Sequence, residues 1–289
     1  MFFVNSGAEA NENALRMALR VTGRKKVLAI THGFHGRTAA AGAVTWKSDA
    51  WYTFPRKPFD VDFIPRDDVA AAHDMIDDTT AAVIFEPVQG VAGAYDLSLE
   101  FAEALRTATA AAGALLIADE VQSGMGRSGQ FFAVQALKVE PDIVTSAKAL
   151  GGGIPCGAVL CSDETASLFG AGTLGTTFGG GPIAAAAISA TIDGILAEHL
   201  LANVREREAQ IREQCVVGPV RKIQGMGLLL GLVCDRPAAE VRDALLEQDI
   251  LTGTSADPEV LRILAPLVLQ EEQVARLADV LASIAPTTD

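Results

Sequence analysis

Positive charge is scarce in this chain of 289 residues, which carries 23 lysine and arginine residues against 36 aspartate and glutamate residues. The formal net charge is therefore -13 at pH 7. A surface of this sign repels nucleic-acid phosphates and anionic lipid headgroups, so we expect neither nucleic acid nor a membrane as a partner. An anionic substrate would have to be bound by particular arginine side chains that overcome the overall field locally.

Cysteine and long apolar runs are also rare. The four cysteines form neither a C-x-x-C pair nor a metal-binding cluster: Cys156, Cys161, Cys215 and Cys234. This usage predicts reduced thiols, no metal site and a cytoplasmic location. No apolar run approaches the ~20 residues needed to span a bilayer. The first five residues lack the basic and apolar segments of a signal peptide, so we expect no secretion.

Nucleotide-binding motifs are absent or incomplete. The chain has no G-x-x-x-x-G-K-[ST] loop, which argues against a P-loop nucleotide triphosphatase. The segment from Gly124 to Gly129 matches G-x-G-x-x-G, but it does not directly join a strand to a long helix. No acidic residue closes a clear βαβ unit ~20 residues later. We interpret this segment as a tight turn.

Short apolar runs alternate with helical patterns in the first part of the chain. The expected strands are residues 2–4, 27–30, 82–85, 114–118 and 142–145. Amphipathic helices, such as residues 100–112, lie between them. Continuous apolar strands that alternate with helices predict an α/β fold with a mostly parallel sheet and helices on both faces. We assign residues 1–182 to this large domain.

The glycine-rich segment 179–182 interrupts this alternation. An alanine-rich helix is expected next, over residues 183–199. The remaining chain mixes strand and helix patterns, as in residues 227–233, 238–248 and 271–282. We therefore predict that residues 183–289 form a linking helix and a smaller C-terminal α+β domain.

In sheets of this kind, ligands bind at the carboxyl ends of the strands. Ser6 and Glu9 follow the first strand and fit a capping box that opens a helix. Gly7 would allow the backbone to approach a ligand closely, and the free N–H groups of a helix N-terminus suit a phosphate. A simple capped helix without a ligand is the alternative interpretation.

Two charged residues follow later strands. Asp119 directly follows the strand at 114–118, and a buried carboxylate there needs a partner, such as a metal, an arginine or a protonated ring nitrogen. A structural salt bridge is the ordinary alternative. Lys148 follows the strand at 142–145 among small apolar residues, which predicts an enclosed amine nucleophile. A solvated loop lysine is the alternative.

Two further clusters offer binding groups. Phe34 supplies an aromatic ring close to Arg37, whose guanidinium can bind a carboxylate through two hydrogen bonds. Phe34 is equally suited to an ordinary core. Thr176 and Thr177 place hydroxyl groups on a glycine-rich turn, a composition that suits a phosphate and is also common in loops.

The order of these motifs is more specific than any one of them. Five motifs follow one another along the chain: NSGAEANE at residues 5–12, FHGRT at 34–38, EPVQG at 86–90, DEVQSGMGRSG at 119–129 and SAKALGGG at 146–153. This series resembles the class III aminotransferases, with the closest likeness to the acetylornithine and ornithine aminotransferase branch. The resemblance covers essentially the whole chain. It implies an aspartate aminotransferase-like fold (fold type I), pyridoxal 5′-phosphate as cofactor and a homodimer with shared active sites.

The resemblance also implies roles for individual residues. Lys148 would hold the cofactor as a Schiff base and move a proton in catalysis, while Asp119 would keep the ring nitrogen protonated. The further cofactor contacts would be Ser6, Gly7, Ala8, Phe34, Val121, Gln122 and, from the neighbouring subunit, Thr177. The substrate contacts would be Arg37, Thr176 and Arg262.

The implied reaction moves an amino group from N-acetylornithine, or a related ω-amino substrate, to a 2-oxo acid such as 2-oxoglutarate, in arginine biosynthesis. Two alternatives remain open. Family members carry an N-terminal segment that this sequence lacks, so the chain is also compatible with a truncated, non-catalytic remnant. The second alternative is an aminomutase or racemase of the same fold. Val91 stands where the family usually has a glutamate, which should leave Arg262 without an acidic partner.

Overall fold

The computed structural model describes residues 1–170 and 172–286, which form two compact units. The first unit comprises Met1–Pro87, Leu97–Met125 and Val134–Asp193. The second comprises Val88–Asp96, Gly126–Ala133 and Gly194–Asp289. The division predicted at residue 182 differs from this in two ways. The chain passes between the units within a helix, and two short earlier segments belong to the second unit.

Hydrogen bonds explain why the segment Val88–Asp96 belongs to the second unit. The Gln224 side chain donates to the carbonyl of Gly93 at 2.9 Å, and the backbone N–H of Gly225 donates to Asp96 at 3.0 Å. Both partners are far away in sequence. Such pairings leave no signal in local hydrophobic periodicity.

The first unit contains a seven-stranded sheet with the order β1-β9-β8-β7-β4-β2-β3. Its strands are β1 (Phe2–Val4), β2 (Lys26–Ile30), β3 (Asp60–Ile64), β4 (Thr80–Phe85), β7 (Leu115–Asp119), β8 (Ile143–Ser146) and β9 (Gly157–Cys161). β9 pairs antiparallel with β1 and β8, and the other pairs are parallel. The predicted mostly parallel sheet is confirmed. β3 and β9 were not anticipated, and β3 carries exposed Asp60 at its start.

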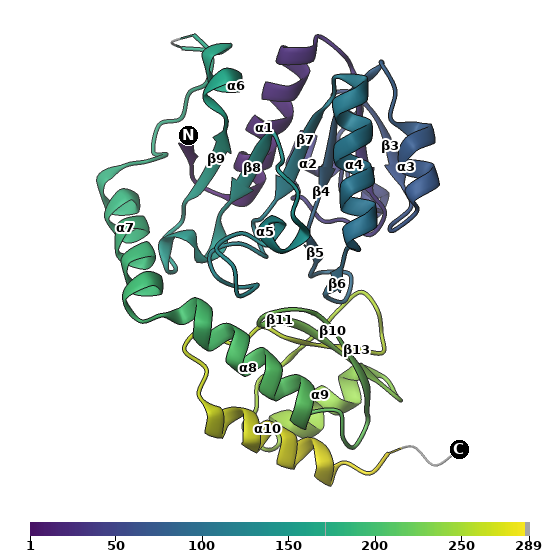
Figure 1. Ribbon diagram of the computed structural model, residues 1–289, viewed down its shortest axis with the longest axis vertical. Coiled ribbons are helices and arrows are strands. Elements are labelled where there is room, and N and C mark those ends of the chain that lie inside the picture. The colour runs from purple at the N-terminus through teal and green to yellow at the C-terminus, as the bar shows by residue number, and fades with distance from the viewer. Residues whose placement is uncertain (171, 287–289) are drawn as a thin grey trace. The chain divides into compact units, whose positions relative to one another are not determined.

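Helices cover the sheet of the first unit (Figure 1). They are α1 (Gly7–Thr22), α2 (Ala39–Ala43), α3 (Val69–Met75), α4 (Leu99–Ala112), α5 (Val134–Leu137) and α6 (Asp163–Ser167). The connections between these elements also contain two short 3-10 helices, η1 (Ser48–Ala50) and η2 (Lys148–Gly151). The segment from Gly124 to Gly129 forms turns, as predicted.

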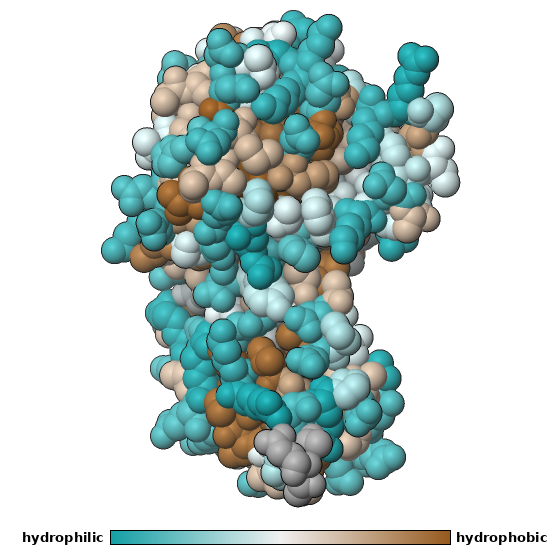
Figure 2. All heavy atoms as spheres, turned by 90° about the vertical axis from the view of Figure 1, so that its right-hand side faces the viewer, coloured by the Kyte–Doolittle hydropathy of each residue, from teal (hydrophilic) through white to brown (hydrophobic). Residues whose placement is uncertain are grey.

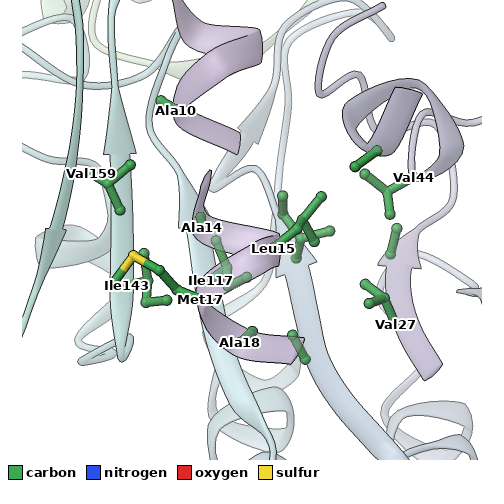
Figure 3. Packing of buried hydrophobic residues seen from close by; sticks show 14 of the residues in the cluster. Ala10, Ala14, Leu15, Met17, Ala18, Val27, Val44, Ile117, Ile143 and Val159 are labelled. Atoms are coloured by element: carbon green, nitrogen blue, oxygen red, sulfur yellow. The ribbon is translucent and has the colours of Figure 1, made fainter. Parts of the chain in front are cut away.

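The apolar face of α1 packs on the sheet, and this packing holds the N-terminus of the helix in place. Ala10, Ala14 and Leu15 are fully buried and face strand residues that include Ile117 and Ile143 (Figure 3). Small alanine side chains let the helix approach the strands closely. Each large apolar side chain buried here contributes roughly 1.5–3 kcal/mol. The N-terminus of α1 is thereby held beside the carboxyl end of β1.

The start of α1 shows half of the predicted capping box. The Ser6 hydroxyl accepts a hydrogen bond from the backbone N–H of Glu9 at 3.2 Å. The Glu9 carboxylate, however, accepts from the backbone N–H of Asn5 at 2.9 Å instead of returning to Ser6. The helix N-terminus is capped, and the first-turn amide groups of Gly7 and Ala8 remain available.

The second unit is a smaller α+β domain, as predicted. Its antiparallel sheet has the order β10-β11-β13-β12, formed by Val220–Met226, Leu229–Cys234, Val260–Ile263 and Gly253–Thr254. A two-stranded ribbon, β5 (Val88–Gln89) and β6 (Tyr95–Asp96), also belongs to it. The helices are α8 (Leu200–Gln214), α9 (Ala238–Leu246) and α10 (Glu271–Ser283).

The linking helix α7 (Pro182–Ala197) ends two residues earlier than the sequence pattern predicts. His199 has a φ of 52°, in the left-handed region, and starts α8. Among the described residues, no helix alone has the length and apolar character to cross a bilayer, although α7 and α8 together, bent by 62°, meet those two criteria. Hydrophilic residues occupy much of the face shown in Figure 2.

Candidate active site

The carboxyl ends of five strands in the first unit surround one cavity of about 480 Å³. Nine of the twelve predicted site residues line it: Ser6, Gly7, Ala8, Phe34, Arg37, Asp119, Val121, Gln122 and Lys148. Asn11, His35 and Glu86 line it as well and were not predicted. The sequence rule that ligand groups follow strand ends therefore located this cavity.

Asp119 ends β7 and is 3% exposed. One carboxylate oxygen accepts from the Asn11 side-chain amide and lies beside His35 Nδ1, both at 2.7 Å. The other oxygen accepts from the backbone N–H of Val121 at 3.0 Å. Thr145 in turn donates to the Asn11 carbonyl oxygen at 2.7 Å. This network satisfies a buried carboxylate and fixes its orientation toward the cavity.

His35 and Glu86 are two titratable residues of the cavity that sequence reasoning missed. Burial raises the pKa of Glu86 to about 7. Burial lowers the pKa of His35, but the hydrogen bond to Asp119 and the negative charges of Asp119 and Glu86 outweigh this, so the net shift is upward. Glu86 directly follows the buried strand β4, the same signal that identified Asp119.

Lys148 opens η2 and has a φ of 46°. A non-glycine residue in the left-handed region carries roughly 1–2 kcal/mol of backbone strain, which is common at functional sites. The sequence predicts an enclosed lysine, whereas Lys148 is exposed at the wall of the cavity. Ala147 and Ala149 are too small to cover its long side chain, so its enclosure depends on what fills the cavity.

Gly7 lets α1 begin against the cavity wall. A Cβ atom at this position would lie 2.6 Å from Val121 Cγ1 and 2.9 Å from Cγ2. The main chain therefore approaches Val121 more closely than any other residue type allows. The positive end of the α1 dipole and the amides of Gly7 and Ala8 would favour an anion at this point.

Replacing Gly7 with alanine should weaken cofactor binding about 10- to 100-fold, because the new methyl group must displace Val121 at an overpacking cost of about 1–3 kcal/mol. The matched control is Gly194→Ala, since an added Cβ there meets no atom within 4 Å. Absorbance titration with the cofactor measures both dissociation constants. Equal constants for the two variants would contradict a tight contact between Gly7 and Val121.

Arg37 stands at the rim of the cavity. Its guanidinium lies over the Trp51 ring, 5.2 Å from the ring centre, and the side chain is exposed. Stacking on an aromatic face restricts the guanidinium while its N–H edges remain available to an anion. The structure thus permits the carboxylate-binding role predicted for Arg37.

The other three predicted residues do not line this cavity. Thr176 is exposed and accepts a hydrogen bond from Asn5, a cavity residue, at 3.3 Å. Thr177 is exposed as well. Arg262 belongs to the second unit, where it donates to the carbonyls of Thr254 and Gly90 at 2.8 and 3.1 Å. Burial lowers the pKa of Arg262.

Comparisons with known proteins agree with these features. A family model described as Aminotransferase class-III matches residues 1–285. The chain is 40% identical to an acetylornithine aminotransferase of Corynebacterium efficiens over 98% of its own length and 71% of the relative's. It is 39% identical to a putative LysW-aminoadipate semialdehyde/glutamate semialdehyde transaminase of Pyrococcus abyssi, over 98% and 75% of the two chains.

A solved structure with a similar fold is an ornithine aminotransferase from Toxoplasma gondii. The TM-score is 0.90 at 28% identity, with 98% of this chain and 72% of that chain covered. That crystal structure is described as having partial occupancy of PLP at the active site.

Proposed function

The chain belongs to the class-III aminotransferases, and from this premise we propose that it transfers the terminal amino group of N-acetylornithine, or of a related ω-amino substrate, to 2-oxoglutarate in arginine biosynthesis. It is an aminotransferase that depends on pyridoxal 5′-phosphate. The observation that carries the proposal is the single cavity lined by Lys148, Asp119 and the N-terminus of α1. The names of the two sequence relatives both describe the transfer of an amino group, with acetylornithine in one and semialdehydes in the other.

The cavity residues fit this cofactor. The α1 N-terminus offers amide groups for the phosphate, and Asp119 offers an oriented carboxylate for the ring nitrogen. Gln122 Oε1 is buried and has no hydrogen-bond partner among residues 1–170 and 172–286, so it can accept from a group in the cavity. When bound, the cofactor supplies an electron sink for the substrate carbon that carries the amine.

The chain's own residues hold the cofactor and move protons. With the cofactor bound, the Lys148 amine would hold it covalently and would move the proton at the substrate carbon that carries the amine. Asp119 keeps a proton on the ring nitrogen. Val121 and Phe34, which both line the cavity, would cover the ring faces and exclude water. This set of roles fits side chains that all line one cavity.

Substrate carboxylates are assigned to Arg37 and Arg262. In the described part of the chain, the Arg262 side chain donates to two carbonyl oxygens, and the nearby loop carries Val91 in place of an acid. A half-buried guanidinium with no counter-charge attracts an anion. We therefore propose that Arg262 binds a carboxylate group of 2-oxoglutarate.

Arg262→Ala should raise the KM for 2-oxoglutarate about 10- to 100-fold, the effect of losing a charged hydrogen-bonded pair worth about 1.5–3 kcal/mol. Arg276→Ala is the control, because Arg276 is exposed on α10 and donates to the carbonyl of Gln248. Steady-state kinetics with varied 2-oxoglutarate measures the effect. An unchanged KM in Arg262→Ala would refute this assignment.

We further propose a cytoplasmic homodimer with shared active sites. The four cysteines are free thiols, which suits a reducing compartment. Phe178, which directly follows Thr177, is 78% exposed, and Ile183 further along the chain is 76% exposed, so large apolar side chains are exposed in the segment that carries the residue assigned to the partner's phosphate. Burying such side chains against a second copy is favourable.

Coexpression of two inactive variants tests the shared site. Thr177→Asp should disable the partner's site by repelling the phosphate, and Lys148→Ala should disable the chain's own site. Mixed dimers then contain one intact site, so equal coexpression should restore about a quarter of wild-type activity, because half of the dimers are mixed. Activity no higher than that of either variant alone would refute the shared site.

Turnover of N-acetylornithine with 2-oxoglutarate tests the proposed reaction directly. Glutamate should form only when both substrates are present. An aminomutase or racemase of this fold would turn over without a 2-oxo acid, so activity independent of 2-oxoglutarate would favour that alternative. Cofactor binding without any turnover would favour the non-catalytic remnant.

A further inference from the structure

Two neighbouring residues of α1 hold the segment that carries Arg37 at both of its ends. The Asn11 side-chain amide donates a hydrogen bond to the carbonyl of His35 at 2.8 Å. The Oε1 atom of Glu12 accepts a hydrogen bond from the backbone N–H of Ala40 at 2.7 Å. Arg37 lies between these two attachment points, so its backbone is fixed relative to α1.

Glu12 provides the cap that α2 lacks in its own sequence. Thr38 stands at the N-cap position of α2, but in the described part of the chain its side chain makes no capping hydrogen bond. The N–H groups at the start of a helix need acceptors from elsewhere. Oε1 of Glu12 accepts from the N–H of Ala41 at 3.3 Å as well as from that of Ala40. The first turn of α2 is therefore anchored to α1, and a carboxylate is favourable at this end of a helix.

Close packing adds to these hydrogen bonds. Gly36 has a φ of 135°, and a Cβ atom there would lie 2.8 Å from the Cβ of Ala8 and 3.0 Å from the Cβ of Ala41. The main chain at Gly36 thus lies directly against the first turn of α1. The Tyr52 hydroxyl donates to the carbonyl of Ala39 at 2.8 Å and supports the start of α2. The segment around Arg37 therefore has little freedom to move away from α1.

We propose that Glu12 is a positioning residue for the substrate carboxylate, because it anchors the backbone that follows Arg37 and so determines where the guanidinium stands. The inference rests on the proposed function, in which Arg37 binds that carboxylate. Arg37 lines the cavity, whereas Glu12 is outside the set of described residues that line it. A guanidinium binds a carboxylate through two parallel hydrogen bonds, so a small displacement of its backbone weakens binding.

Glu12→Leu removes the acceptor with little change in side-chain size. It should raise the KM for N-acetylornithine about 3- to 30-fold, the range expected for the loss of a helix cap. The kcat and the dissociation constant of the cofactor should stay close to the wild-type values, since Lys148 and Asp119 keep their places. Glu12→Gln retains an oxygen that can accept from the Ala40 N–H and should return the KM most of the way to wild type. A variant that was merely less stable would show a lower kcat at an unchanged KM.

A double-mutant cycle tests whether Glu12 acts through Arg37. Arg37→Ala should raise the same KM by itself. Adding Glu12→Leu to Arg37→Ala should raise it no further, because the guanidinium that Glu12 positions is already gone. Glu103→Leu is the control, since Glu103 is exposed on α4 and does not line the cavity, and its KM should equal that of the wild type. Additive effects of Glu12→Leu and Arg37→Ala would overturn the inference.

Two further results separate this inference from the proposed function. An unchanged KM in Glu12→Leu, beside a raised KM in Arg37→Ala, would refute the role of Glu12 and leave the function intact. A wild-type chain that forms no glutamate from N-acetylornithine and 2-oxoglutarate would overturn both. If Glu12→Leu does not fold, Glu12→Asp replaces it, because aspartate keeps the charge and withdraws the oxygen by one methylene group. The KM of Glu12→Asp should then lie above that of the wild type, and an equal KM would refute the inference.

Discussion

Lys148→Ala is expected to reduce transamination by at least about 10⁴-fold, because the variant loses both the amine that attaches the cofactor and the base that moves the proton. The visible absorbance of the covalently bound cofactor should disappear with it. The fold should persist, since Lys148 is exposed and makes no contact that the core requires. Alanine in place of a strained lysine leaves the backbone strain of η2 unchanged.

Lys138 provides a matched control for this substitution. It is an exposed lysine with a φ of 57°, close to the 46° of Lys148, and it does not line the cavity. Lys138→Ala should therefore retain wild-type turnover and absorbance. Appreciable activity in Lys148→Ala, or equal losses in both variants, would contradict the assigned role of Lys148.

Asp119→Asn is expected to have the second largest effect, a loss of about 10²- to 10⁴-fold in turnover. The neutral amide cannot hold a proton on the ring nitrogen by charge. It also presents an N–H₂ group to Asn11 or to the backbone N–H of Val121, both of which are donors in this network. We therefore expect the variant to lose about 3 kcal/mol of unfolding free energy as well.

Glu120→Gln separates the role of Asp119 from a general need for buried acids. The two carboxyl groups are adjacent, and both are buried. Glutamine can accept from the Val134 N–H and donate to the Ser123 hydroxyl, so most of the bonding of Glu120 survives. Urea unfolding and steady-state kinetics should show a large change for Asp119→Asn and a small one for Glu120→Gln. Similar kinetic losses in both variants would refute a specific role for Asp119.

Much of the first unit could be predicted from sequence because its signals are local. Apolar runs predict five strands of the sheet, and polar residues after three of these strands, Ser6, Asp119 and Lys148, line the cavity. β3 escaped notice because it alternates exposed and covered residues, unlike the buried runs of β2 and β4. The path of the chain between the two units depends on long-range hydrogen bonds that no local pattern reveals.

In the candidate active site, too, contacts between residues far apart in the sequence could not be predicted from local patterns. Asp119 was recognisable from its place at a strand end, whereas Asn11 lies inside α1 and reaches Asp119 only because that helix packs on the sheet. His35 lies outside every strand and helix predicted from the sequence, and its contact with Asp119 spans 84 residues. The exposure of Lys148 depends on a cavity that forms only when five strand ends meet. Residue type and spacing identify candidate groups, and tertiary packing decides their partners.

Borohydride reduction followed by peptide mass spectrometry tests most directly whether Lys148 holds the cofactor in this cavity. Hydride addition converts the bond between lysine and cofactor into a stable amine, so the attached residue can be read from the modified peptide. We expect a phosphopyridoxyl group on Lys148 in the wild-type chain and none in Lys148→Ala. Modification of a different lysine, or a wild-type chain that carries no modification at all, would contradict it.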